Sequence, residues 1–123
     1  MEDYLYQDLT REIIGVAFTV YNSLGYGFRE KIYQRGMSVE FTILKIPFQE
    51  ECPVRIYYRD KIIGKYYIDF VVDNKVVVEL KVANDFYTID IKQVLSYLKA
   101  NNLKLGLLII FNKDGVKIKR IIN

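Results

Sequence analysis

Apolar residues recur every three or four positions near the start of the chain, and this spacing predicts two helices. The first is expected over residues 4–24 and ends at the glycine-rich turn 25–27. The second is expected over about residues 29–44, before Pro47 breaks the pattern. Its buried side is expected to carry four apolar residues, Ile32, Val39, Ile43 and Leu44.

Most of the remaining chain is rich in β-branched and aromatic residues, which favour strands. A third helix is expected over residues 88–101, where apolar side chains again have helical spacing. The order helix, helix, three strands, helix, two strands predicts an α/β fold with a central mixed sheet flanked by helices. The last strand, with alternating lysines, is expected at a solvated edge of the sheet. The predicted strands are residues 48–58, 62–72, 76–82, 105–111 and 116–122.

The composition narrows the possible chemistry. With 123 residues, 51% of them hydrophobic, one folded domain is expected. The absence of histidine excludes Ser-His-Asp and Cys-His catalysis and histidine zinc sites. The single cysteine, Cys52, excludes an internal disulfide. The acidic residues 1–4 are unlike a signal peptide, so a cytoplasmic location is expected. The net charge of +3 is compatible with nucleic acid but does not decide the partner.

Three charged residues stand within the most apolar strands, where charges are scarce without a specific role. They are Asp69, Glu79 and Lys81, and the last two share a strand face because they are two residues apart. Two carboxylates suit a hard cation such as Mg²⁺ or Mn²⁺. Lys81 could then orient an attacking water or stabilise charge on phosphate oxygens. The pattern therefore indicates metal-assisted phosphodiester hydrolysis.

The turn between the second and third strands decides whether the two acids meet. A three-residue loop at 73–75 would place Asp69 directly opposite Glu79, and Tyr67 opposite Lys81. A two-residue turn would instead put the two acids on opposite faces of the sheet. The site hypothesis therefore predicts the three-residue loop. An ordinary cross-strand salt-bridge cluster is the alternative interpretation of the same residues.

Several short motifs resemble those of known nucleases. Asp69-x9-Glu79-x-Lys81 on a hairpin resembles the motif of the PD-(D/E)XK nuclease superfamily. Gln93-Val94-Leu95-Ser96-Tyr97 matches the Q-x-x-x-Y pattern of its RecB-like branch. Gly27-Phe28-Arg29-Glu30-Lys31-Ile32-Tyr33 matches the G-x-x-E-x-x-Y signature of a small family in the same superfamily. Two departures are Ile68 in place of the motif's proline, and Asp90 where close relatives are expected to carry histidine.

The resemblance implies a single restriction-endonuclease-like domain over residues 1–123. Within it, residues 1–25 would form the N-terminal helix, 28–111 the nuclease core and 113–123 the C-terminal edge strand. It also implies a role for each matching residue. The implied metal ligands for Mg²⁺ or Mn²⁺ are Glu30, Asp69 and Glu79, with the Leu80 carbonyl as a further contributor. The implied catalytic residues are Lys81, Gln93 and Tyr97, the tyrosine either packing beside the site or touching a phosphate.

Each supporting residue also has a simpler explanation. Glu30 would suit the start of a helix through the helix dipole, and Gln93 and Tyr97 could simply pack on one helix face. Five tyrosines could stack on unpaired bases or be half-buried sheet residues; these are Tyr57, Tyr58, Tyr66, Tyr67 and Tyr87. Basic residues of the last strand could contact phosphates or guard the sheet edge; these are Lys117, Lys119 and Arg120.

Two classes of function follow. The first is a metal-dependent nuclease that cuts nucleic acid, DNA in preference to RNA. The second is a nuclease-like module with little turnover that binds nucleic acid or a protein partner, or forms a homo-oligomer. A purely structural scaffold is a third interpretation, but it leaves Asp69, Glu79 and Lys81 unexplained.

Overall fold

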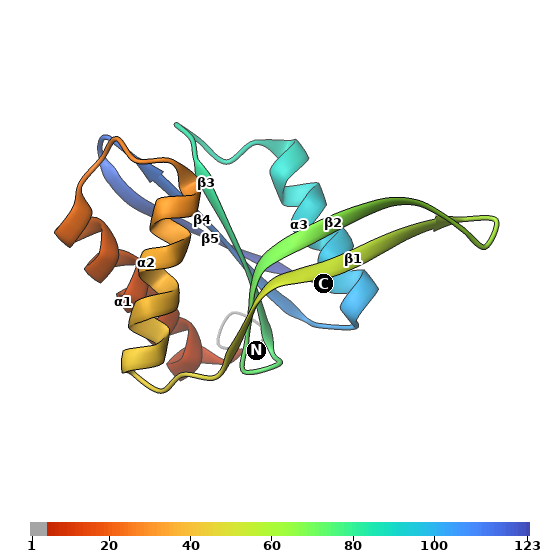
Figure 1. Cartoon of the computed structure of the whole chain (residues 1–123), viewed down its shortest axis with the longest axis horizontal. Coiled ribbons are helices and arrows are strands. Elements are labelled where there is room, and N and C mark those ends of the chain that lie inside the picture. The colour runs from red at the N-terminus through yellow and green to blue at the C-terminus, as the bar shows by residue number, and fades with distance from the viewer. Residues whose placement is uncertain (1–4) are drawn as a thin grey trace.

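The computed structural model describes residues 5–123. In these residues, three helices and five strands follow one another in the order that the sequence predicts (Figure 1). The expected helix start at residue 4 lies outside the described residues, and the first helix begins at Gln7. The elements are α1 (Gln7–Leu24), α2 (Glu30–Ile43), β1 (Phe48–Tyr58), β2 (Lys61–Val72), β3 (Val76–Val82), α3 (Thr88–Asn101), β4 (Leu105–Asn112) and β5 (Gly115–Ile122).

The five strands form one mixed sheet in the order β1-β2-β3-β4-β5. Strands β3 and β4 are parallel, and α3 makes the crossover between them; the other neighbouring pairs are antiparallel. The α/β class with a mixed sheet is confirmed. Strand β4 is buried along its whole length, and β5 lies at an edge with Lys117 and Lys119 exposed, as expected. Arg120 does not face a free surface, because it bonds to Leu5 O and Thr10 Oγ1 beside α1.

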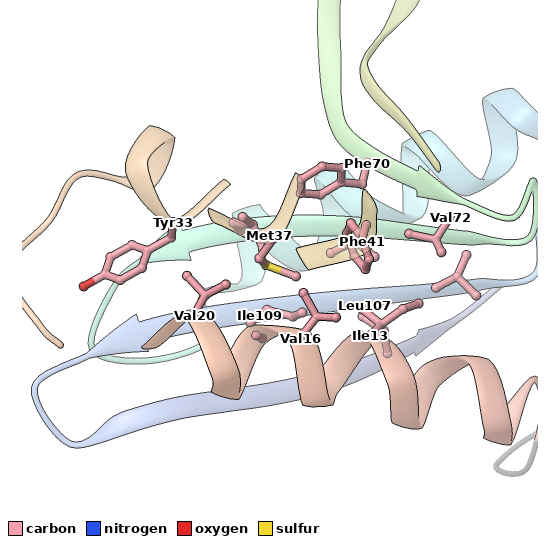
Figure 2. Packing of buried hydrophobic residues seen from close by; sticks show 14 of the residues in the cluster. Ile13, Val16, Val20, Tyr33, Met37, Phe41, Phe70, Val72, Leu107 and Ile109 are labelled. Carbon is pink, nitrogen blue, oxygen red and sulfur yellow. The ribbon is translucent and has the colours of Figure 1, made fainter. Parts of the chain in front are cut away.

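Helices cover both faces of the sheet. Helices α1 and α2 pack on one face, where Figure 2 shows their side chains meeting those of β2 and β4. Helix α3 packs on the opposite face, over a second apolar cluster. The layers approach closely at two glycines: an added Cβ at Gly36 would lie 2.7 Å from Val20, and one at Gly106 would lie 2.5 Å from Val94. Each glycine therefore sets the distance between two packed elements.

The prediction for the buried side of α2 is wrong. The four residues expected there are 36–64% exposed, whereas Tyr33, Met37 and Phe41 are fully buried (Figure 2). The Tyr33 ring stacks on Phe111 with centroids 4.3 Å apart, and Phe41 meets Phe70 edge-on at 5.2 Å. Because α2 is apolar on both sides, spacing alone could not choose between them, and the larger rings turned inward.

The β1–β2 hairpin leaves the body of the fold. It extends past α3, and its tip is the part of the chain farthest from α1 and α2 (Figure 1). Strand β2 pairs with β3 only through the segment 70–72, and beyond it pairs with β1 alone. Within residues 5–123, no helix is both long and apolar enough to cross a membrane.

Candidate metal and phosphate site

The loop between β2 and β3 has three residues, as the site hypothesis requires. Val72 pairs with Val76, and Lys75 N donates to the Val72 carbonyl at 3.0 Å. Asp73 and Asn74 make the turn in the left-handed region, with φ of 52° and 54°. This register brings the two acids of the motif to the same level on neighbouring strands.

At that level the acids replace the backbone ladder. Regular pairing of β2 with β3 ends at Phe70 and Val78. Beyond it, Asp69 N donates to Glu79 Oε1 at 2.9 Å, and Leu80 N donates to Asp69 Oδ2 at 2.8 Å. Each carboxylate thus takes an amide of the opposite strand where the strands begin to separate. The two acids are neighbours held in a fixed arrangement.

The separation of the strands corrects one expectation. Tyr67 does not lie opposite Lys81, because it pairs with Pro53 on β1 and β2 has already parted from β3. The space opened between the strands is the space that the side chains of Asp69 and Glu79 occupy.

Both acids carry the electrostatic cost of burial. Burial, together with the charge of the neighbouring Asp69, raises the pKa of Glu79 to about 8. Burial likewise raises the pKa of Asp69 to about 6, with Glu30 and Glu51 adding repulsion. Glu79 is only 5% exposed. A cation between the two carboxylates would offset this cost.

Lys81 does not supply that cation directly. Among residues 5–123 its ion pair is with Asp90 on α3, at 3.8 Å, rather than with either acid of the hairpin. Its charge still lowers the pKa of both acids. The salt-bridge-cluster interpretation therefore does not describe the arrangement. Asp90, the departure from the expected histidine, has a clear role in holding the lysine.

Glu30 approaches the end of β3 from the other side. It is the first residue of α2, and its Oε1 accepts a hydrogen bond from Val82 N at 3.0 Å. Its bond is thus to β3 rather than to its own helix. Its negative charge raises the pKa of both Asp69 and Glu79. The helix-dipole explanation alone does not account for this contact.

The residues around Glu30 fix the start of α2. Gly27 has φ of +115°, a conformation that strains any residue with a Cβ. Tyr33 is fully buried, and its hydroxyl donates to the Gly25 carbonyl at 2.6 Å. The glycine and the tyrosine of the G-x-x-E-x-x-Y motif therefore have structural roles that aim Glu30 at Val82.

An open groove of about 670 Å³ runs between the start of α2 and the β2 acid. Two of its residues, Gln34 and Glu51, are not among those predicted from the sequence. Gln34 is 3% exposed, and its amide donates to Glu51 Oε1 at 3.1 Å; Lys31 pairs with the same carboxylate. The sequence offered one signal, because Gln34 follows Glu30 by four residues and so shares its helix face. Glu51 reaches the groove through the observed β1–β2 register, which puts it at the level of Asp69. The groove is lined by Gly27, Phe28, Arg29, Glu30, Lys31, Gln34, Glu51, Asp69 and Val82.

Lys81 and Gln93 line a second hollow, of about 370 Å³, beside α3. Tyr97 is only 1% exposed and lies beside Tyr66, with ring centroids 6.4 Å apart. Burial raises the pKa of the Tyr97 hydroxyl, and the charges of Glu79 and Asp69 raise it further. Tyr97 is thus a packed neighbour of the acids. The structure thus divides the expected site residues: Glu30 and Asp69 line the groove, whereas Lys81 and Gln93 line the hollow.

Comparison with known proteins agrees with this architecture. The sequence matches the PD-(D/E)XK nuclease superfamily over residues 7–121. The chain belongs to this superfamily. Its fold is similar to the crystal structure of SSO0001, with a TM-score of 0.59, 17% identity and coverage of 76% of this chain. The chain spans 50% of that structure's chain, and the likeness concerns the fold. Curated proteins give no significant match.

PD-(D/E)XK nucleases typically use divalent metals, and the donor set can be tested against that chemistry. Among residues 5–123, no three acidic or cysteine side chains converge as a metal cluster. Glu30, Asp69 and Glu79 each accept a hydrogen bond from a backbone amide with one carboxylate oxygen. A hard divalent ion prefers oxygen ligands, and the buried carboxylates of Asp69 and Glu79 are of this kind. In each of them one oxygen accepts the amide hydrogen bond, and the second oxygen could bind the ion. Glu30 is bonded to Val82 at the end of β3, three residues after Glu79.

Proposed function

We propose that the protein is a metal-dependent nuclease of the G-x-x-E-x-x-Y branch, which hydrolyses phosphodiester bonds of nucleic acid. The observation that carries the proposal is the buried Asp69–Glu79 pair, held by two amide hydrogen bonds at a groove in a PD-(D/E)XK chain. Burial raises the pKa of both carboxyl groups, and the Asp69 charge adds to the rise at Glu79, so both would gain from a bound cation.

The three acids take the metal-binding roles in this proposal. Asp69 and Glu79 would hold Mg²⁺ or Mn²⁺, and Glu30 would contribute from the start of α2 on exchanging its bond to Val82 N. A bound ion of this kind supplies positive charge at the phosphate oxygens and makes water a better nucleophile. The two amide bonds keep the carboxylates oriented before substrate arrives.

Residues of β3 and α3 take the remaining roles. In hydrolysis, water oxygen bonds to phosphorus, the bond to the leaving sugar oxygen breaks, and that oxygen gains a proton. The Lys81 ammonium would stabilise the phosphate oxygens or orient the water, with Asp90 setting its position. Gln93 would hydrogen-bond to substrate or water in the hollow it shares with Lys81. Tyr97 would pack beside the acids.

The proposed substrate is DNA in preference to RNA, and the proposed location is the cytoplasm, where the single Cys52 would stay reduced. A protein partner or a second copy of the chain is part of the proposal, because the net charge of the chain is only +3 and a strong nucleic-acid binder usually carries more positive charge.

Cleavage assays test the proposal directly. Single- and double-stranded DNA and RNA are incubated with Mg²⁺ or Mn²⁺ and the wild type, Asp69→Ala or Lys81→Ala. Cleavage is expected with the wild type and a loss of at least about 100-fold in each variant, because each removes charge stabilisation at the reacting phosphate. The matched control is Asp73→Asn with Lys75→Ala, which removes an acid and a lysine from the loop of the same hairpin and keeps a residue that tolerates the left-handed turn. Metal-dependent cleavage that survives both site substitutions contradicts the proposal.

A nuclease-like binding module is the second candidate. It is favoured by the bonding of all three acids to backbone amides, which leaves no three-carboxylate cluster in the described residues. This candidate predicts no cleavage of any of the four substrates and no metal binding by calorimetry, together with retained nucleic-acid binding.

A further inference from the structure

The projecting part of the β1–β2 hairpin, residues 53–67, carries a net positive charge and is here called the arm. The arm contains four basic residues and one acid, Asp60, for a net charge of +3. The chain has 18 basic and 15 acidic residues in all, so 14 of each remain outside the arm. The rest of the protein is therefore neutral overall. The basic residues of the arm are Arg55, Arg59, Lys61 and Lys65.

One face of the arm alternates rings and cations. Arg55 pairs across the strands with Lys65, and Pro53 pairs with Tyr67. Because residues two apart share a strand face, Tyr57 lies on the same side as Arg55. Both tyrosines are at least half exposed, and Lys65 Nζ lies 5.3 Å from the centre of the Tyr67 ring. These four residues, Arg55, Tyr57, Lys65 and Tyr67, are here called the outer face.

The opposite face of the arm is held by the body. Val54 is buried there, and Ile56 packs against the same apolar cluster as α3. The arm is thus supported on one side, while Tyr57 and Tyr67 on the outer face remain at least half exposed. Arg55 and Tyr57 also border a hollow beside Ala100 and Asn101 at the end of α3. The four side chains of the outer face are therefore exposed on a hairpin that packs against the body through its other face, and they take no part in the core.

The chemistry of the outer face suits a single nucleic-acid strand. Cations attract phosphates without regard to sequence, and exposed rings stack on unpaired bases. The arm contains no Asn, Gln, Ser or Thr, so apart from its cations and Asp60 it has no polar side chain of the kinds that read base edges in a duplex groove. In a duplex, the bases are already stacked on each other and offer no face to a tyrosine.

We propose that the outer face of the arm binds single-stranded nucleic acid without sequence preference and leads it to the acid pair. The proposal rests on the proposed function, because Tyr67 precedes Asp69 by two residues on β2. At the rise of a strand, the ring lies about 7 Å along β2 from the acid, and Lys65 about 13 Å. A strand stacked on the outer face therefore ends beside the groove.

Binding of labelled 20-nucleotide oligothymidylate, measured by fluorescence anisotropy, tests this proposal. The buffer contains EDTA, so cleavage plays no part. The wild type is expected to bind the oligonucleotide more tightly than a duplex of equal length. Tyr57→Ala and Tyr67→Ala are each expected to weaken binding about fivefold or more, because each removes a stacking surface. The double variant Arg55→Ala, Lys65→Ala is expected to reduce the slope of log affinity against log salt by about 1.4.

Matched controls lie on other parts of the surface. Lys117→Ala with Lys119→Ala removes two exposed cations from β5, and Phe18→Ala removes an exposed ring from α1. Both should bind as the wild type does. Circular dichroism and thermal melting of every variant should match the wild type, since the substituted side chains are exposed. Outer-face variants that bind as the wild type, equal losses in the controls, or tighter binding of the duplex would each overturn the proposal.

The two proposals fail separately. Asp69→Asn should bind the oligonucleotide normally in EDTA, because the arm is intact. Cleavage by the wild type together with normal binding by all outer-face variants would reject the arm and keep the nuclease. Loss of binding in the outer-face variants without cleavage of any substrate would keep the arm and reject the nuclease.

Discussion

The two halves of β2 differ in almost every respect, although they belong to one continuous strand. In the inner half, Phe70, Val71 and Val72 are at most 7% exposed and pair with strands on both sides. In the outer half, Tyr66 and Tyr67 are about half exposed, and pairing continues with β1 alone. The inner half belongs to the core, and the outer half is available for binding.

Asp69 stands at the junction of these halves. It is the position where β2 stops pairing with β3, and its carboxylate and that of Glu79 bridge the gap to backbone amides. The site thus depends on β2 passing, at Asp69, from a strand paired on both sides to a strand paired with β1 alone. A regular sheet would leave no room for two acids, and a free hairpin would not hold them in place.

The largest effect should come from the inner half. Phe70→Ala removes a ring that is fully buried between Phe41 and Phe48, and should cost about 3–5 kcal/mol of unfolding free energy. Tyr67→Ala, three residues away, should change stability by less than about 0.5 kcal/mol because the ring is exposed. Urea denaturation followed by circular dichroism measures both. Equal costs for the two substitutions would show that the arm is part of the core.

A smaller effect of opposite sign is expected at the junction. The pKa of Glu79 is raised above its ordinary value of 4.5 to about 8, so between these values the folded protein binds more protons than the unfolded chain. Stability of the metal-free protein should therefore fall as pH rises through that interval. Glu79→Gln keeps the acceptor for Asp69 N but removes the charge, and should stabilise the metal-free protein at pH 8.5 by about 1–3 kcal/mol.

The pH dependence gives this prediction its control. The advantage of Glu79→Gln should shrink as pH falls from 8.5 to 5, because the wild-type carboxyl group becomes protonated as well. Denaturation curves in EDTA at both pH values measure it. If Glu79→Gln lowered the free energy of unfolding equally at pH 8.5 and pH 5, the negative charge of Glu79 would already be stabilised by groups of the protein, and the prediction would be wrong.

Much of this fold follows from local sequence. The bounds of β1, β3 and α3 agree with the prediction, because turn residues and changes of period mark their ends. The sequence left two lengths open for the β2–β3 loop, and the structure has the three-residue loop that the site hypothesis required. The candidate acids could be named from the sequence, whereas their meeting depended on that loop.

Other features depended on contacts between distant segments. Helix α2 has apolar residues on both sides, and the sheet selected the side with Tyr33 and Phe41. Gln34 and Glu51 became neighbours only because β1 returns past α2. The ion pair of Lys81 with Asp90 likewise required the position of α3 over the sheet. Periodicity and spacing within one segment carry no information about these approaches.

The central claim is that Asp69 and Glu79 bind a divalent cation, and isothermal titration calorimetry with Mn²⁺ tests it most directly. The wild type and the loop control Asp73→Asn should each bind one ion, whereas Asp69→Asn and Glu79→Gln should lose most of the binding heat. The substitutions keep the size of each side chain and remove only its charge, so loss of binding would follow from the missing ligand. Unchanged binding in both junction variants, or no binding by the wild type, would contradict the account.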